Sequence, residues 1–479
     1  MRPSRAIPTG LAALTVALAS FAFLASGPRH HVAAAVTDPQ PDVLLILTDD
    51  QRWDQLSRMP TVQQELVGKG IRFDQAFVVN SLCCPSRATI LTGRYSHSTG
   101  VYKNQMPYGG FSSFKKGKDA NTLPVWLDQA GYHTALVGKY MNAYNDKHAF
   151  YEPPGWDDWQ ALTTLDKPGR DYYHYSIAEN EQLTTYGAAG TIDEANYMTD
   201  VLADRADAFI RSTPTTTPMF LAFWPWGPHK PSTPPARHLH ALPDFQGIRP
   251  PNLNEADVSD KPAWVQALAK GTNTYDAQRK REMQNLLAVD DAVAQLLAAL
   301  ADTGRLEDTL IVYASDNGTS GRSHRWGPKM TVWEETIRIP LVMRYDPLTG
   351  GVARVDSSHL ALNLDFAPTI ADLAGVTPVG AEGVSLLPFL DGSPPADWRD
   401  RFLIEHLTDG KNPPSYCAVR TTRYKYVRYS TGEEELYDLQ SDPFELQSRH
   451  ADPAMASVLA GLRADTVAMC SPPPPGYSF

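Results

Sequence analysis

The sequence predicts an α/β fold in which helices sandwich a mostly parallel central sheet, followed by a small C-terminal α+β domain with an antiparallel sheet. Short apolar runs, typical of strands buried on both faces, alternate with helical patterns through most of the chain. After about Pro395 the pattern changes to the polar–apolar alternation of antiparallel strands. A chain of 479 residues is long enough for one large and one small domain.

Four of the apolar runs are followed by clusters of polar residues. The runs are 43–47, 134–137, 219–223 and 310–313, and the polar groups after them are Asp49-Asp50, Gly138-Lys139, His229-Lys230 and Ser315-Asp316-Asn317-Gly318. Ligands in folds of this class bind outside the carboxyl ends of the strands. We therefore expect all four clusters to lie along one edge of the sheet.

Helical and C-terminal elements complete the expected architecture. One helix is expected from near Pro124 to Gly131, with Thr122 as its N-cap, and a longer amphipathic pattern covers 283–300 and ends before Gly304. Residues 401–406, 416–429 and 434–439 alternate like strands, 453–469 resembles a last helix, and the Pro-rich residues 471–479 are expected to form a loose tail. The expected domains are 36–395 and 396–479.

The first 35 residues have the pattern of a secretory signal peptide. Arg2 and Arg5 precede an apolar run over 11–25, and the alanines at 33–35 offer a cleavage site. The alternative is a membrane anchor, but the run is short for a span of about 20 residues. We expect a secreted or extracytoplasmic protein without stable membrane insertion. A net charge of -11, with no basic run, argues against nucleic acid as a partner.

Two acidic pairs suggest a metal site at the sheet edge. Asp49, Asp50, Asp316 and Asn317 offer the hard oxygen ligands that calcium and magnesium prefer. Each pair alone is more often an ordinary turn or a solvated strand end than a metal site. On neighbouring strands, the two pairs together favour metal binding.

The four cysteines fall into two groups. Cys417 and Cys470 could form a disulfide after export. Cys83 and Cys84 are adjacent, so a bridge between them would be strained. One reading of this pair is a structural thiol pair at a helix start, and the residues that follow it give another: Cys83-x-Pro85-Ser86-Arg87 and then Leu91-Thr92-Gly93-Arg94.

This motif resembles the signature of the formylglycine-dependent sulfatases, a family of the alkaline-phosphatase-like superfamily. The resemblance continues through residues 42–50, 286–318, Lys329 with 333–340, 365–370 and 435–439. Gly138-Lys139-Tyr140-x-Asn142 and the doubled cysteine are similar to the N-acetylglucosamine-6-sulfatase branch. In many family members a histidine stands where this chain has Met141.

The resemblance implies that Cys83 is oxidised to formylglycine by a formylglycine-generating enzyme. The hydrated aldehyde would carry two hydroxyls, one to attack sulfur and one to expel sulfate afterwards. One calcium ion per chain would be bound by residue 83 together with the two acidic pairs, which are Asp49, Asp50, Asp316 and Asn317. The expected activity is that of a sulfuric ester hydrolase.

The resemblance also implies roles for four polar side chains. Arg87 would hold the aldehyde hydrate, Lys139 and Lys329 would stabilise charge on the sulfuryl oxygens, and His229 would bind sulfate and protonate the leaving alcohol. Without the resemblance, the two lysines would be ordinary surface residues and His229 a loop histidine. His97, His324 and His359 are expected to be structural or peripheral, with His324 the one candidate for a pocket residue.

Three activities fit these residues. A sulfatase acting on sulfated sugars or on aryl sulfates fits best, and the branch resemblance favours a 6-sulfated hexosamine. A phosphonate or phosphate monoester hydrolase of the same superfamily would share the metal site. A carbohydrate-binding relative without catalysis would lack bound calcium or the modification of Cys83.

Overall fold

The central sheet follows directly from the buried apolar runs of the sequence. A computed structural model describes residues 40–163, 165, 169–271 and 275–479, and the expected signal peptide (1–35) lies outside them. The four predicted strands are β1 (Asp42–Thr48), β4 (His133–Gly138), β8 (Met219–Trp224) and β9 (Thr309–Ser315). They are parallel neighbours in the order β9-β1-β8-β4. The predicted parallel sheet is confirmed.

Shorter strands extend this sheet on both sides. Among the described residues it has ten strands, in the order β11-β2-β10-β9-β1-β8-β4-β5-β6-β7. The added parallel strand is β5 (Asp158–Thr163), beside β4. The antiparallel additions are β10 (Leu341–Arg344), β6 (Tyr175–Glu179) and β7 (Gln182–Tyr186), and β11 (Arg354–Asp356) runs parallel to β2 (Ile71–Phe73).

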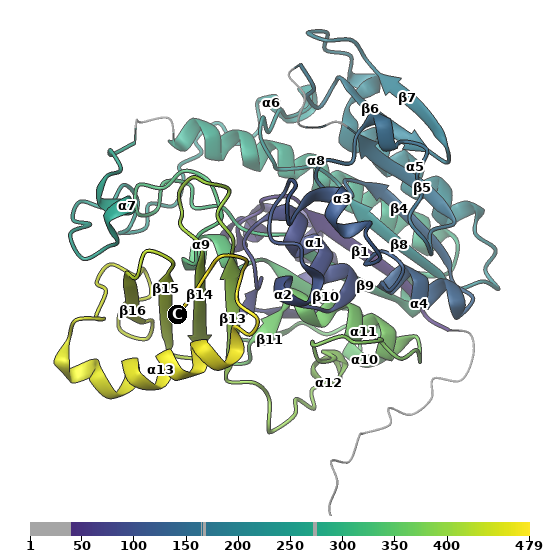
Figure 1. The fold of residues 1–479 in the computed structure, drawn as a ribbon. Coiled ribbons are helices and arrows are strands. Elements are labelled where there is room, and N and C mark those ends of the chain that lie inside the picture. The colour runs from purple at the N-terminus through teal and green to yellow at the C-terminus, as the bar shows by residue number, and fades with distance from the viewer. Residues whose placement is uncertain (1–39, 164, 166–168, 272–274) are drawn as a thin grey trace, which may run out of the picture. The chain divides into compact units, whose positions relative to one another are not determined.

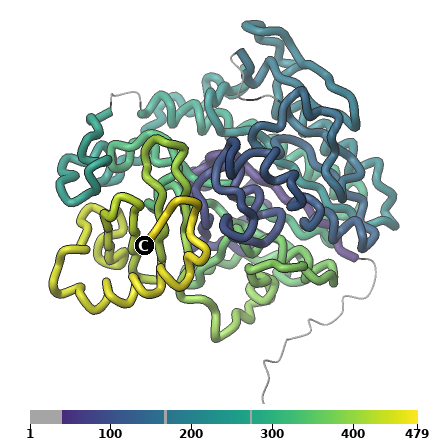
Figure 2. The backbone as a smooth tube through the Cα atoms, viewed as in Figure 1, coloured from purple at the N-terminus to yellow at the C-terminus, as the bar shows by residue number. Residues whose placement is uncertain are grey.

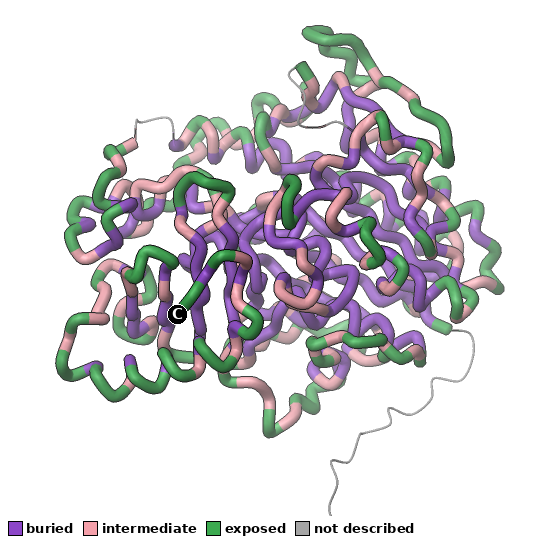
Figure 3. Tube along the Cα trace, in the orientation of Figure 1, coloured by how far each residue is buried: buried purple, intermediate pink, exposed green. Residues whose placement is uncertain are grey.

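Helices cover both faces of the sheet because β1 is apolar on both sides. Val43, Leu45 and Leu47 pack into one core cluster with α1 (Cys83–Thr92), α4 (Leu123–Gln129) and α11 (Phe366–Leu373). Leu44 and Ile46 pack into a second cluster with α5 (Met198–Ser212) and α8 (Tyr275–Asp302). Figure 1 shows these two helix layers, and Figure 3 shows buried residues concentrated between them.

The C-terminal part has its own antiparallel sheet, as predicted. Its strands are β13 (Arg401–His406), β14 (Tyr416–Thr421), β15 (Tyr424–Tyr429) and β16 (Glu434–Asp438), paired in sequence order and packed against α13 (Ala456–Met469). Lys425 Nζ donates to Glu334 Oε1 at 3.0 Å and thereby links β15 to α9 (Glu334–Ile337). Figure 2 traces this last, yellow part of the chain.

The end of the chain is packed, where the sequence predicted a loose tail. Cys417 and Cys470 form a disulfide, and Tyr477 packs against this disulfide and Leu403 with 6% of its surface exposed. The Tyr477 hydroxyl also donates to the backbone oxygen of Arg428 at 3.1 Å. The buried ring of Tyr477 therefore anchors this proline-rich segment.

The remaining elements are short connections between these layers. They are β3 (Ala76–Phe77), β12 (Ala361–Leu362), α2 (Ser96–Thr99), α3 (Gly110–Phe114), α6 (Ala236–Leu239), α7 (Ala263–Gln266), α10 (Asp346–Thr349) and α12 (Leu387–Leu390). Among the described residues, no helix combines the length and apolar character that a membrane span requires.

A buried ion pair fixes the start of the sheet and gives a first prediction. Arg305, 5% exposed, donates to both carboxylate oxygens of Asp42 at 2.9 and 2.8 Å and to the backbone oxygen of Thr213 at 2.9 Å. Arg305→Met should lower the free energy of unfolding by about 3–5 kcal/mol, because it leaves Asp42 buried without its counter-charge. Urea denaturation measures this loss.

Arg211 is the matched control for this measurement. It also pairs with two carboxylates, Asp207 and Asp302, but 42% of its side chain is exposed. Exposed ion pairs contribute little, so Arg211→Ala should leave the denaturation midpoint nearly unchanged. Equal losses of unfolding free energy in Arg305→Met and Arg211→Ala would contradict the conclusion that burial makes the Asp42 ion pair important.

Candidate active site

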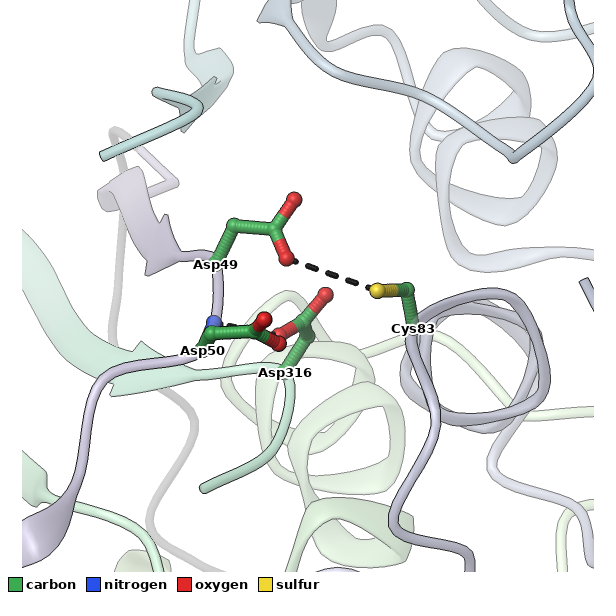
Figure 4. A group of neighbouring side chains, drawn as sticks. All are labelled: Asp49, Asp50, Cys83 and Asp316. Carbon is green, nitrogen blue, oxygen red and sulfur yellow. Dashed lines mark hydrogen bonds between the residues drawn. The ribbon is translucent and has the colours of Figure 1, made fainter. Parts of the chain in front are cut away.

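Three carboxylates meet where β1 and β9 end. Asp49 and Asp50 follow β1 and Asp316 follows β9, and these strands are paired up to Thr48 and Ser315. The Asp50 backbone N–H donates to Asp316 Oδ1 at 3.2 Å. The ligand atoms of Asp49, Asp50, Asp316 and Cys83 all lie within 4.8 Å of one another (Figure 4). The predicted convergence at one sheet edge is therefore found.

Cys83 is the first residue of α1 and points into this group of acids. Its side chain is completely buried, with Sγ 3.4 Å from Asp49 Oδ1. Pro85 is tolerated in this first turn because it needs no hydrogen-bond donor there. Burial raises the pKa of the Cys83 thiol, and the negative charge of Asp49 raises it further. As an unmodified thiol, Cys83 is therefore a poor nucleophile.

Three cations surround the acids. Arg87 lies one turn after Cys83 on α1, and its Nε donates to Asp316 Oδ2 at 2.9 Å. Lys139, directly after β4, contacts Asp49 Oδ2 through its Nζ, and Lys329 contacts Asp50 Oδ1 in the same way. Lys329 Nζ also donates to Cys83 Sγ at 2.6 Å. Both predicted lysines thus lie in the site.

The charges in this group are strongly coupled. Burial alone would raise the pKa of Asp49, but the surrounding positive charges, led by Lys139, lower it. Burial alone would lower the pKa of Lys139, but Asp49 outweighs that effect and raises it. Burial and the charge of Asp49 together raise the pKa of Asp316. A further positive charge between the two carboxylates would favour ionisation of both.

Asn317 shows that the donor set fits a hard divalent cation. Its Nδ2 donates to Asp50 Oδ1 at 2.6 Å and to the backbone oxygen of Gly318 at 2.8 Å. Its Oδ1 is buried and has no hydrogen-bond partner among the described residues. A buried, unpartnered amide oxygen on a residue that contacts Asp50, together with the three carboxylates, fits the oxygen-rich shell that calcium accepts.

His229 lies at the open side of the site, after β8. Its Nε2 is 3.7 Å from Asp50 Oδ2, and its ring stacks on Trp226 with centroids 5.3 Å apart. Its Nδ1 lies 2.7 Å from the backbone oxygen of Lys230, which requires a proton on Nδ1. Nε2 is thus the ring nitrogen that faces the carboxylates.

The three other candidate histidines, His97, His324 and His359, each pair with a carboxylate outside this group of acids and cations. His324 is buried and its Nδ1 lies 2.6 Å from Glu255 Oε2, so it is no part of the cavity wall beside Lys139. His97 pairs with Glu405, and His359 with Asp356. The expectation that His97 and His359 are structural or peripheral agrees with these contacts.

Met141 stands where the family resemblance leads us to expect histidine, and its thioether accepts a hydrogen bond from the Cys84 thiol. It is 3% exposed, and its Sδ lies 3.6 Å from Cys84 Sγ. The neighbouring Asn142 lines a cavity of about 380 Å³ that begins at Lys139. Sequence reasoning missed other residues of its wall, among them Gln105, Asn145 and Trp226. Their proximity in sequence to Lys139 and His229 was the available signal for Asn145 and Trp226.

The fold and this arrangement are those expected of a hydrolase of anionic esters, because buried cations and a group of acids that could hold a divalent cation surround one candidate nucleophile. Residues 41–376 match the family model of the sulfatases, and residues 322–470 match that of the N-sulphoglucosamine sulphohydrolase C-terminal region. The chain belongs to the sulfatase family, as the motif around Cys83 predicted, and is a sulfuric ester hydrolase.

Known proteins of this family resemble the chain over most of its length. An arylsulfatase of Volvox carteri is 32% identical, over 90% of this chain and 74% of its own. Human N-acetylglucosamine-6-sulfatase is 31% identical, over 92% of this chain and 88% of its own. A solved sulfatase-like structure, in complex with its substrate D-glucosamine-2-N,6-O-disulfate, superposes with a TM-score of 0.79 at 25% identity, covering 90% and 98% of the two chains.

Gly138 positions Lys139 and gives a second prediction. Its φ is 126°, and a Cβ at this position would lie 2.1 Å from the backbone oxygen of Trp224 in β8. Gly138→Ala should cost about 1–3 kcal/mol of overpacking in addition to the strain of a positive φ. Gly131 is the control, since its φ is 88° but no atom lies within 4 Å of the added Cβ. Equal urea midpoints for the two variants would contradict the close approach.

Proposed function

We propose that this sulfatase hydrolyses 6-O-sulfate monoesters of N-acetylhexosamines, with residue 83 as formylglycine and one bound calcium ion. The observation that carries the proposal is the burial of Cys83 among three carboxylates and three cations. The similarity to N-acetylglucosamine-6-sulfatases, together with Gly138-Lys139-Tyr140-x-Asn142, supports the choice of sugar. A formylglycine-generating enzyme would act on Cys83 before folding buries it.

Modification solves a chemical problem that the unmodified site has. The thiol of Cys83 is held protonated by burial and by the charge of Asp49. Formylglycine in its hydrated form would supply two hydroxyls, one for attack on sulfur and one for release of sulfate. A hydroxyl oxygen bonded to Cβ of this hydrate would occupy the place of the Cys83 Sγ, beside Asp49 and Lys329.

Four side chains would hold the calcium ion. Asp49, Asp50 and Asp316 would each give a carboxylate oxygen, and Asn317 its Oδ1, with residue 83 completing the set. Bound there, the cation would acidify a hydroxyl of residue 83 and offset negative charge on the sulfuryl group. The unpartnered Asn317 Oδ1 supports this set.

Arg87, Lys139 and Lys329 would orient the site and bind the sulfuryl group. Arg87 holds Asp316 and, through Nη1 at 2.5 Å, the backbone oxygen of Lys139. It therefore orients both the helix start that carries residue 83 and the strand end that carries Lys139. Lys139 and Lys329 would bind the sulfuryl oxygens, where fixed positive charge stabilises the transition state.

His229 would bind the sulfate and give a proton to the leaving alcohol. With Nδ1 bonded to the backbone oxygen of Lys230, the ring orientation is fixed and Nε2 is left for the substrate. Stacking on Trp226 holds the ring plane. A general acid held in this way meets the geometric requirement for protonating an ester oxygen.

The location and domain organisation complete the proposal. Residues 1–35 would act as a signal peptide, so that the protein works outside the cytoplasm. Residues 36–395 would form the catalytic domain and 396–479 the small C-terminal domain. The disulfide between Cys417 and Cys470 is consistent with an oxidising compartment.

Replacing Cys83 tests the nucleophile. Cys83→Ala should abolish turnover of N-acetylglucosamine 6-sulfate and 4-nitrophenyl sulfate while urea denaturation stays cooperative. Cys83→Ser should accept sulfate once at most, because a single hydroxyl cannot regenerate itself. Mass spectrometry of the peptide with residue 83 should show formylglycine in the active protein. The matched control is Cys84→Ala, equally buried and adjacent, which should remain active.

Two results would refute this assignment. Active protein with an ordinary thiol at residue 83 would remove the need for formylglycine. Hydrolysis of an aryl phosphonate much faster than of the matching aryl sulfate would instead favour a phosphonate monoester hydrolase of the same superfamily.

Metal content provides an independent test. Asp316→Ala should lose the calcium that elemental analysis detects in the purified protein, and with it the activity, since a carboxylate of the shell is missing. Asp302→Ala, at an exposed position on α8, is the control and should retain the metal. Unchanged calcium in Asp316→Ala would mean that the ligand set is wrong.

A further inference from the structure

A cavity beside Lys139 is the place where the alcohol part of a bound sulfate ester would lie. It measures about 380 Å³, and its wall includes Lys139, Asn142, Gln105, Asp146 and Trp226. Because Lys139 belongs both to this wall and to the charged site around Cys83, a sulfate ester held by Lys139 would lie next to the cavity. A mixed polar wall of this kind fits a ring that carries hydroxyl groups.

Asn142 is the unusual residue of this wall. It is 9% exposed, and its Oδ1 is buried without a hydrogen-bond partner among the described residues. Asn145, three residues later in the same wall, has both amide atoms engaged: Oδ1 accepts from the Lys147 N–H at 3.0 Å and Nδ2 donates to the Ala143 backbone oxygen at 3.3 Å. Leaving a buried polar atom unpaired costs about 1–3 kcal/mol, so such atoms call for an explanation.

The backbone around Asn142 is held in place on several sides. Ala143 has a φ of 64°, a left-handed conformation that disfavours residues with a Cβ. The Asn142 backbone oxygen accepts from the Phe111 N–H at 2.8 Å, and Met141 packs against Cys84. The backbone position of Asn142 is thus set before any ligand binds, which lowers the entropic cost of a contact with that ligand.

We propose that Asn142 Oδ1 accepts a hydrogen bond from a ring hydroxyl of the sulfated sugar, and so determines specificity for sugar sulfates over aryl sulfates. This inference rests on the proposed function. An unpaired acceptor requires a donor on the ligand, and a sugar offers hydroxyls where the ring of a simple aryl sulfate offers none. Asn142 is therefore a positioning residue for the alcohol part of the substrate.

The competing role for Asn142 is contact with residue 83 in place of the missing histidine. In that case Asn142 would act on the reacting atoms, which are the same in every sulfate ester. Two substrates that differ only in the alcohol separate these roles. We choose N-acetylglucosamine 6-sulfate and 4-nitrophenyl sulfate.

Asn142→Leu and Asn142→Ala are the test variants. Leucine keeps the branched shape of asparagine without its acceptor, and alanine tests the result if the larger leucine does not fit. For the sugar, kcat/KM should fall roughly 10–100-fold, since the hydroxyl loses its partner. For the aryl sulfate it should change by less than about threefold, because no hydrogen bond is lost. Retained aryl sulfate turnover also shows that each variant folds.

Met141→Leu is the matched control in the same turn. It conserves volume and leaves the amide of Asn142 untouched, so the ratio of the two kcat/KM values should stay that of the unmodified protein. An equal fall for both substrates in the Asn142 variants would overturn the proposal in favour of contact with residue 83. No fall for the sugar would overturn it as well. Failure of the unmodified protein to hydrolyse either ester would instead contradict the proposed function.

Discussion

The burial of negative charge at the ends of β1 and β9 is the constraint on which the site depends. Asp49 and Asp316 are completely buried, and buried carboxylates are tolerated only where opposite charge lies beside them. That charge comes from Arg87 on α1, Lys139 after β4 and Lys329 in the loop after β9. These positive charges thus hold together segments that are far apart in the sequence. Binding of a sulfate ester requires positive charge at the same place.

Much of this arrangement could be predicted because parallel strands place their carboxyl ends together. The apolar runs identified β1, β4, β8 and β9, and the polar residues just after them became the site. The flanking strands were not predictable in the same way. β10 (Leu341–Arg344) and β2 (Ile71–Phe73) are only four and three residues long, and too short a run carries no clear period. The place of β10 depends on pairing with β9, and that of β2 on pairing with β10, and no local pattern specifies either pairing.

The cavity wall was largely beyond prediction for a related reason. Its residues lie on loops, and the loops are positioned by tertiary contacts rather than by periodic patterns. The loop with Gln105 is held by Asn104, whose Oδ1 accepts from the Cys84 N–H at 3.0 Å. A hydrogen bond between residues 20 positions apart therefore ties a loop of the cavity wall to the start of α1, and nothing in the order of residues reveals it.

The charged groups of the site and the residues that line the cavity consequently lie in different parts of the molecule. The groups that handle charge lie at rigid strand ends and on α1, where small displacements would be costly, since each is paired with a buried partner. The residues that line the cavity lie mostly on loops, where Met141 stands at the position of the family's histidine and contacts the Cys84 thiol, so that His229 is the proposed proton donor. Because Asn142 lines the cavity, the contact proposed for it with the alcohol could change without disturbing the charge balance that holds Asp49 and Asp316.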